Sequence, residues 1–112
     1  MKSASFNNEL KFNDSKVAIK VILETSFSKE IRILMREGQL MKEHKAPYPI
    51  IVHLLKGSIN FGISVEMHFL NEGEILTLDA NVPHDLKATS ESIVRLTLSK
   101  FDHVERVQNL NN

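Results

Sequence analysis

The sequence contains no cysteine, and this absence excludes several kinds of protein at once. Without thiols the chain cannot form disulfides, zinc ribbons, iron–sulfur clusters or a cysteine nucleophile. Its stability must come from a hydrophobic core, for which 112 residues, 42% of them hydrophobic, are sufficient. Glycine and proline are also scarce, with four and three residues, and no segment has the composition of a flexible linker.

An excess of charge of one sign is missing as well, because 14 basic and 14 acidic residues give a formal net charge of zero. A nucleic-acid-binding protein needs a basic excess to displace counterions from phosphates, so we expect no nucleic-acid partner. The longest apolar runs are about six residues, too short to cross a bilayer, so we expect no membrane partner. The first residues, MKSASFNNELKF, lack the apolar stretch of a secretory signal, and the expected location is cytoplasmic.

We expect one folded domain with a polar segment at each end. Residues 1–16 are mostly polar and form a predicted N-terminal arm, and residues 17–101 carry the regular apolar patterns of the domain itself. Residues 102–112 form a polar C-terminal tail. Polar termini without apolar anchors rarely order themselves, so the tail is expected to be frayed.

Apolar residues of the domain recur at every second position, which is the period of strands and not of helices. Each alternating run spans about five to eight residues, is rich in β-branched side chains and ends in a turn signal. Eight or so such strands at regular spacing indicate an all-β fold, an antiparallel sandwich or barrel. The clearest runs are 17–23, 31–35, 59–63 and 94–98.

The segment 50–55 departs from this alternation, because both of its faces are apolar apart from His53. A half-buried strand should alternate, whereas a strand buried on both sides need not. One face is expected to line the core. The other should meet a second sheet, a terminal segment or a partner subunit, and this favours a homodimer.

Histidine is the side chain best suited to acid–base or metal chemistry at neutral pH, and two of the five histidines attract attention. His44 and His84 each lie near a turn, where a single histidine is most simply a satisfied or solvent-facing side chain. Other catalytic signatures are missing. The sequence has no Gly-x-Ser-x-Gly and no glycine-rich phosphate loop followed by lysine.

The surroundings of these two histidines resemble a known family. Residues 38–57 read Gly-x5-His-x-Ala-x3-Ile-x6-Gly, with His44 as the histidine, and resemble the first cupin motif, Gly-x5-His-x-His-x3,4-Glu-x6-Gly. Residues 73–88 read Gly-x5-Asp-x-Asn-x2-His-x3-Ala, with His84 as the histidine, and resemble the second motif, Gly-x5-Pro-x-Gly-x2-His-x3-Asn. The intervening residues 58–72 have a normal length for the family.

The resemblance covers about residues 29–99, most of the chain. It implies a small single-domain cupin of the RmlC-like type, with the strands rolled into an antiparallel jelly-roll barrel. The barrel would bring the two motifs, and with them the two histidines, side by side.

The departures from the motifs bear on function. In metal-dependent cupins the first motif supplies two histidines and a glutamate, and the second supplies one histidine. Ala46 takes the place of the second histidine, and Ile50, or Ile51 in the longer spacing, that of the glutamate. Catalytic metal sites have three or four protein ligands. The resemblance therefore implies that His44 and His84 hold Zn²⁺, Ni²⁺ or Cu²⁺ weakly at most, and do not retain iron or manganese.

Strand alternation extends the predicted site, because residues two positions apart on a strand share one face. The resulting cup is mostly apolar and suits a small ligand with one or two polar groups. Its alternative is a barrel core that has closed over the former metal position. The predicted pocket residues, in chain order, are Lys42, His44, Ala46, Ile50, Val52, Leu54, His84 and Leu86.

A third imidazole in the barrel would complete a three-ligand metal site, and His68 is the candidate. No motif position predicts it there, so we expect it at the surface or in an interface. His53 should face the other sheet or a partner, and His103 lies in the tail. Neither is assigned a catalytic role.

Three functions fit these patterns. The first is a stand-alone cupin that binds a small molecule in the barrel without turnover. The second is a metal-dependent cupin enzyme, an oxygenase or isomerase, using His44, His84 and a third ligand that the sequence does not identify. The third is a structural or regulatory dimer without a ligand, motivated by residues 50–55. The sequence leaves open whether the chain is an enzyme, and it assigns no catalytic residue.

Overall fold

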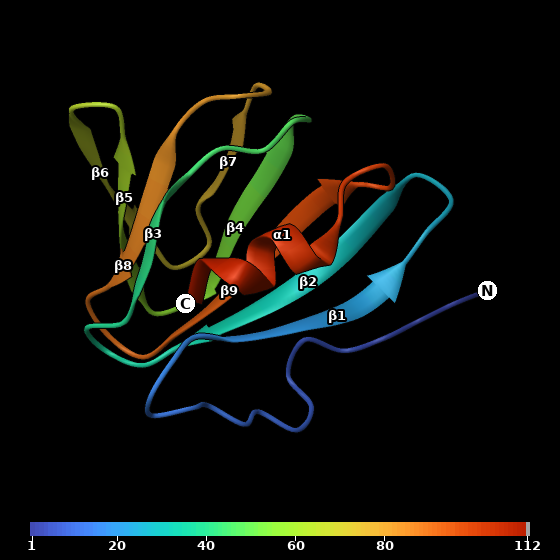
Figure 1. Cartoon of the computed structure of the whole chain (residues 1–112). Coiled ribbons are helices and arrows are strands. Elements are labelled where there is room, and N and C mark those ends of the chain that lie inside the picture. The colour runs from blue at the N-terminus through green and yellow to red at the C-terminus, as the bar shows by residue number, and fades with distance from the viewer. Residues whose placement is uncertain (112) are drawn as a thin grey trace.

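The computed structural model describes residues 1–111, in which nine strands form two antiparallel sheets that face each other (Figure 1). One sheet has five strands in the order β1-β2-β9-β4-β7, and the other has four in the order β3-β8-β5-β6. The all-β jelly-roll prediction is confirmed, although the two sheets do not close into a continuous barrel. The strands are β1 (Ala18–Glu24), β2 (Ser28–Met35), β3 (Leu40–His44), β4 (Ile50–Lys56), β5 (Ser58–Ile63), β6 (Glu66–Asn71), β7 (Ile75–Leu78), β8 (His84–Ala88) and β9 (Ser92–Ser99).

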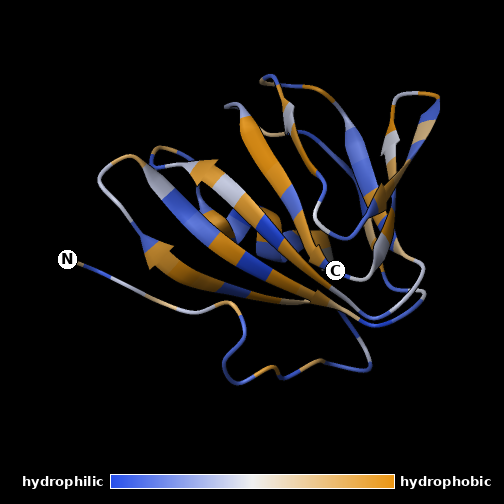
Figure 2. Cartoon of the chain, turned by 180° about the vertical axis from the view of Figure 1, so that it is seen from behind, coloured by the Kyte–Doolittle hydropathy of each residue, from blue (hydrophilic) through white to orange (hydrophobic). Residues whose placement is uncertain are grey.

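The core lies between the two sheets and is built from the alternating apolar residues of each strand. Ile31, Ile33 and Met35 face inward from β2 and are at most 2% exposed. From the opposite sheet, Ile59 and Phe61 of β5 face them and are equally buried. Hydrophobic and hydrophilic segments accordingly alternate along β2 and β9 in Figure 2. The period of two in the sequence thus reports which side chains enter the core.

The doubly apolar segment 50–55 lies within β4, between β9 and β7 in the five-stranded sheet. Its inward residues are fully buried, as expected. On its outward side Ile51 is 36% exposed, and His53 and Leu55 are half-buried. Nothing in residues 1–111 covers this side completely, so the prediction of a partner subunit here stays a prediction.

The C-terminal tail is ordered, and the expectation that it is frayed is wrong for residues 102–111. It forms a short helix, α1 (Val104–Gln108), and a 3-10 turn, η1 (Asn109–Asn111). Val107 is only 1% exposed, and Val104 and Leu110 pack against the core at a spacing of three residues. α1 packs against β1, and η1 against β3, so this segment covers the opening between those two sheet edges (Figure 1). Asn112 lies outside the described residues.

The predicted N-terminal arm contains no helix or strand and runs beside β1 (Figure 1). It contacts the outward side of β2 through hydrogen bonds from Arg32. Among residues 1–111, no helix combines the length and the apolar character that crossing a bilayer requires.

Candidate functional site

The two histidines of the motif-like segments lie side by side on the inner face of the four-stranded sheet. His44 ends β3 and His84 begins β8, and the two residues are paired partners across these strands. Their ring centroids are 4.2 Å apart, with the ring planes at 61° in an edge-to-face arrangement. The predicted meeting of the two imidazoles is therefore confirmed. His84 is 3% exposed and His44 is half-buried, so His44 is the more accessible ring of the pair.

A β-bulge next to His44 corrects one predicted pocket residue. The register between β3 and β8 shifts between Met41 and His44, so that two residues of β3 oppose one residue of β8. The extra residue reverses the alternation. Met41, 1% exposed, shares the inner face with His44, whereas Lys42 is exposed. The expectation that Lys42 lies on the same side as His44 is wrong.

Each imidazole is held in one tautomer by a backbone carbonyl. His44 Nδ1 lies 2.7 Å from the Lys42 carbonyl oxygen, and His84 Nδ1 lies 2.9 Å from that of Val82. Since a carbonyl oxygen only accepts hydrogen bonds, Nδ1 must carry the proton in both rings. In a neutral imidazole Nε2 then keeps its lone pair, and neither Nε2 has a hydrogen-bond partner in the described chain. The pair thus offers two free acceptors of the kind that metals and ligand donors use.

Both rings are neutral at pH 7. Burial is the main reason that the pKa of His44 falls from 6.5 to about 4, and the charges of His84 and Arg106 act in the same direction. The hydrogen bond to the Lys42 carbonyl opposes this shift. Burial also lowers the pKa of His84, again with help from Arg106. Neutral rings are required if the Nε2 lone pairs are to accept hydrogen bonds or coordinate a metal.

Phe61 forms the back of the site, and the sequence reasoning did not include it. Its ring stacks on His84, with centroids 5.5 Å apart and planes 9° from parallel. Phe61 is fully buried on β5, which pairs directly with β8. The alternation of apolar residues in 59–63 was the available signal, because it makes Phe61 an inward-facing residue of the core.

The remaining predicted pocket residues belong to the hydrophobic core. Ala46 and Ile50, which replace two ligands of the cupin motif, are 3% and 4% exposed. Both lie in the same apolar cluster as Phe61, and neither has a side chain that can coordinate a metal. The three other predicted pocket residues, which are also core residues and 0–3% exposed, are Val52, Leu54 and Leu86.

The same fold occurs in solved structures of other proteins. An RmlC-like cupin from Desulfovibrio desulfuricans matches with a TM-score of 0.80 and 20% sequence identity, over 88% of this chain and 96% of that one. An RmlC-like cupin from Shewanella frigidimarina matches with a TM-score of 0.74 and 14% identity, over 88% and 91% of the two chains. The chain has the cupin fold. KdgF from a Halomonas species also matches, with a TM-score of 0.74 and 17% identity over 88% and 94%.

At these identities the likeness is one of fold. No protein-family model matches the sequence, and no curated protein matches it. What the chain does with the cupin fold must therefore be argued from its own residues.

One departure from the cupin motif has a clear backbone reason. Asn81 stands where the second motif has a glycine, and its φ is +67°. Asparagine tolerates this left-handed conformation better than other residues with a side chain. The Asn81 N–H donates to the Ala46 carbonyl at 2.7 Å, which ties the loop before β8 to the end of β3. This turn leads into β8, whose first residue, His84, pairs with His44.

The other histidines do not join the pair. His68 is exposed on β6, with Nε2 3.4 Å from the Glu66 carboxylate. His53 lies on the outward side of β4, where its buried Nδ1 has no partner among the described residues, and His103 is exposed just before α1. In residues 1–111, no three His, Cys, Asp or Glu side chains come together as a metal site would need.

The C-terminal helix adds a cation near the histidines, which the sequence reasoning missed. Arg106 of α1 donates through Nε and Nη2 to the two carboxylate oxygens of Asp102, at 2.9 and 2.8 Å. Asp102 is 2% exposed, and Arg106 also reaches the Lys45 carbonyl, next to His44, at 3.5 Å. Its positive charge helps to lower both histidine pKa values. The sequence did contain a signal for this helix: Asp102 and Arg106 have the i,i+4 spacing of a helical ion pair, and Val104 and Val107 have the spacing of one helix face.

Proposed function

We propose that this protein is a cupin-fold binding module that holds a small molecule at the His44–His84 pair without turnover. The observation that carries the proposal is the pair of neutral imidazoles, 4.2 Å apart, each presenting a free Nε2 lone pair. Binding sites of this kind combine an apolar wall with a few convergent polar groups. Phe61 and the core residues around it supply the wall.

The chemistry of the pair selects for ligands with hydrogen-bond donors. Two acceptors on adjacent strands match two hydroxyl or amino groups of one ligand. The nearby Arg106 guanidinium disfavours a cationic ligand and favours one that is neutral or anionic. We therefore expect a small polyhydroxylated or hydroxy-acid molecule rather than an amine.

The four-ligand metal site of the cupin motif does not fit this chain. Ala46 and Ile50 fill two of its positions with buried apolar side chains, and no carboxylate takes over their role in the described residues. Iron and manganese bind nitrogen ligands weakly and need more donors than two imidazoles. We derive no reaction step through such a metal. The two Nε2 atoms suit weak Zn²⁺, Ni²⁺ or Cu²⁺ binding, which is the alternative function to be tested.

The test compares metal content and ligand response in tag-free protein. Elemental analysis after growth in metal-supplemented medium is expected to find less than stoichiometric metal. A panel of small hydroxylated and carboxylated molecules is expected to contain one that raises the melting temperature. That response should be lost in His44→Gln and His84→Gln and kept in His103→Gln, an exposed histidine outside the site.

Two results would overturn the binding proposal. Stoichiometric metal that disappears in both site variants would favour the metal-dependent enzyme. A ligand response that survives in both variants would place binding elsewhere in the molecule.

We also propose that two copies associate through the outward side of β4. Ile51 is 36% exposed there, and exposed apolar residues of the neighbouring segments extend the surface, Ile75 at 59% and Phe27 at 73%. Ile51 and Phe27 line one hollow, and Ile75 is the cross-strand partner of His53, on the same side of the five-stranded sheet. Contiguous exposed apolar surface of this kind marks interaction sites.

A further inference from the structure

Arg32, in the middle of β2, is a buried cation with an incomplete set of partners. It is 4% exposed and lies on the outward side of the five-stranded sheet, away from the histidine pair. Nη1 donates to the carbonyls of Asn8 at 2.7 Å and Phe6 at 3.3 Å, and Nη2 donates to that of Glu9 at 3.3 Å. Its Nε is buried without any partner, and no carboxylate pairs with Arg32 in the described chain. A buried charge without a counter-charge is costly, so this position favours an anion.

Further cations surround Arg32. Lys20 of β1 is its direct cross-strand partner, and like charges at such positions repel. Lys20, Lys11 of the arm and Arg32 line one hollow of about 180 Å³ between the arm and β1. An adjoining hollow of about 450 Å³ shares Lys11 and adds Lys16. Among the described residues, Glu9 is the acid that lines the smaller hollow and the larger hollow has none, so in a chain with no net charge this surface is locally positive.

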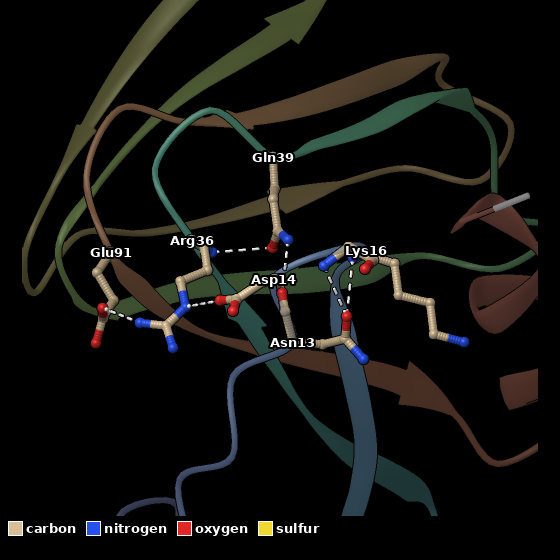
Figure 3. Close-up of polar contacts among 7 residues, drawn as sticks. Asn13, Asp14, Lys16, Arg36, Gln39 and Glu91 are labelled. Carbon is tan, nitrogen blue, oxygen red and sulfur yellow. Dashed lines mark hydrogen bonds and ion pairs between the residues drawn. The ribbon is translucent and has the colours of Figure 1, made fainter.

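The wall of the first hollow is preformed, because the arm is fixed to the domain where it meets β1. Gln39 Nε2 donates to the Asn13 carbonyl at 2.7 Å, and Arg36 pairs with Asp14 at 3.0 Å (Figure 3). Asn13 Oδ1 accepts the backbone N–H of Lys16 at 3.2 Å, and the Lys16 side chain extends away from these contacts (Figure 3). Together with the three carbonyls on Arg32, these bonds hold the arm on both sides of Lys11. A rigid wall lowers the entropic cost of binding a small ligand.

We propose that the hollow lined by Lys11, Lys20 and Arg32 is a binding site for a phosphate group, either inorganic phosphate or a small phosphomonoester. Three of the five guanidinium N–H groups of Arg32 donate to carbonyls of the arm, two from Nη1 and one from Nη2, so the Nε–H and one Nη2–H have no partner in the described residues. These two adjacent donors and the ammonium groups of Lys11 and Lys20 place three positive charges around one hollow, which matches a doubly charged anion better than a singly charged carboxylate. This arrangement suits a compact tetrahedral dianion. The site is separate from the histidine pair and does not depend on the function proposed for it.

The experiment is a titration of isotope-labelled protein with inorganic phosphate at constant ionic strength, with chloride as the competing salt. Saturable shifts of backbone amide signals are expected around residues 9–11, 18–20 and 32–34, with no shift around His44 and His84. Absence of saturable shifts there would overturn the proposal. The same titration with glycerol 3-phosphate separates the two sources. Tighter binding than phosphate assigns the site to a phosphomonoester, and equal or weaker binding assigns it to the free ion.

Three charge variants sharpen the test without disturbing the fold. Lys11→Ser and Lys20→Ser change exposed side chains and are each expected to weaken phosphate binding by about threefold to fivefold. Glu9→Gln removes the repulsive acid and is expected to strengthen it. Lys87→Ser, an exposed lysine of β8 on the other sheet, is the matched control and should leave binding unchanged. Equal weakening in Lys87→Ser, or unchanged affinity in the Lys11 and Lys20 variants, would contradict a built site.

Arg32 itself is tested by Arg32→Lys, which keeps the charge and removes the Nε donor. Because it also removes hydrogen bonds to the arm, its melting temperature and the amide spectrum of residues 40–99 serve as the folding control. With the fold intact, weaker phosphate binding than in the parent supports the assigned donor. Unchanged binding would overturn the role of Arg32.

Discussion

At the scale of single residues, the defining feature is a pair of imidazoles whose protons are placed by the backbone. The carbonyls of Lys42 and Val82 fix Nδ1–H in both rings, and burial keeps the rings neutral. Both free nitrogens therefore retain lone pairs at physiological pH. Without these two carbonyls the rings could change tautomer and donate to each other, which would remove one acceptor.

The pH dependence of stability follows from the lowered pKa of His44. Its pKa is 6.5 in an ordinary environment and about 4 in the folded chain. Between these values the unfolded chain binds more protons, so acidification destabilises the fold and the loss is complete below about pH 4. Urea unfolding at neutral pH and near pH 5, where most carboxylates are still ionised, measures this loss. His44→Gln should show a smaller loss than the parent, and His103→Gln the same loss. An undiminished loss in His44→Gln would contradict the buried neutral ring.

Sequence reasoning placed His44 and His84 together but misplaced Lys42, and the reason lies in the bulge. Alternation assigns faces correctly only while the register is continuous. One extra residue in β3 moved Lys42 to the surface and put Met41 and His44 on the same face. The prediction that His44 and His84 meet was unaffected by the bulge, because it came from the residue spacing of the cupin motif and not from the alternation of faces. No pattern in a single sequence marks the bulge.

At the scale of elements, the turns that bring the strands together depend on left-handed residues. Gly57, between β4 and β5, has a φ of +97°, and a Cβ there would lie 2.3 Å from Ser92 Oγ and 2.4 Å from the Glu91 carbonyl oxygen. Gly73, between β6 and β7, has a similar φ of +91°, but a Cβ added there would meet no atom within 4 Å. An added Cβ would therefore cause only backbone strain at Gly73, but both backbone strain and a steric clash at Gly57.

We predict that Gly57→Ala is more destabilising than Gly73→Ala. The second substitution costs only the strain of a left-handed residue, about 1–2 kcal/mol. The first adds a collision with the backbone before β9, and we expect a total of about 3 kcal/mol or more. Urea midpoints at neutral pH measure both. Equal costs for the two variants would show that the neighbouring strand yields freely.

The C-terminal helix depends on the buried ion pair between Asp102 and Arg106. Asp102 is 2% exposed, and its replacement leaves the partly buried guanidinium of Arg106 without its carboxylate and the backbone N–H of His103 without its acceptor. We expect Asp102→Ala to lower the free energy of unfolding by about 2 kcal/mol and to speed amide hydrogen exchange in α1. Glu105→Gln, an exposed change on the same helix, is the control. Unaltered exchange in α1 after Asp102→Ala would show that Val107 alone anchors the helix.

The tail shows where compositional reasoning fails. Residues 102–112 are polar overall, and polarity alone predicted fraying. The helix forms because Val104, Val107 and Leu110, spaced three residues apart, cover an opening in the core. Asp102 and Arg106 form an ion pair that stabilises it. That opening exists only after the two sheets have assembled, so the tertiary structure decides the local one.

At the scale of the whole molecule, the period-two pattern and two loosely matching motifs were sufficient to predict the cupin fold. The fold depends on which side chains enter the core, and that information is spread over all nine strands of the described chain. The site depends on a few contacts between strands distant in sequence, such as the stacking of Phe61 on His84. The alternation of residues 59–63 could predict that Phe61 faces inward, but not that it stacks on His84, because the register of β5 against β8 is not written in either strand alone.

The assembly state tests the proposed role of the outward side of β4. We expect a dimer at micromolar concentration in sedimentation equilibrium, because exposed apolar residues there offer a contiguous surface. Ile51→Lys should shift the equilibrium to monomer without lowering the melting temperature of the monomer. Val65→Lys, an apolar residue 98% exposed in another loop, is the control. A parent protein that is monomeric at this concentration would contradict the proposal.

The central claim is that His44 and His84 are neutral, both protonated at Nδ1, with Nε2 free on each ring. Long-range ¹⁵N–¹H correlation spectra of histidine side chains, recorded through a pH titration, measure tautomer and pKa for each ring in one experiment. We predict the Nδ1–H form for both rings at pH 7, and a His44 midpoint near 4. An Nε2–H form in either ring, or a His44 midpoint at its ordinary value of 6.5, would contradict the claim.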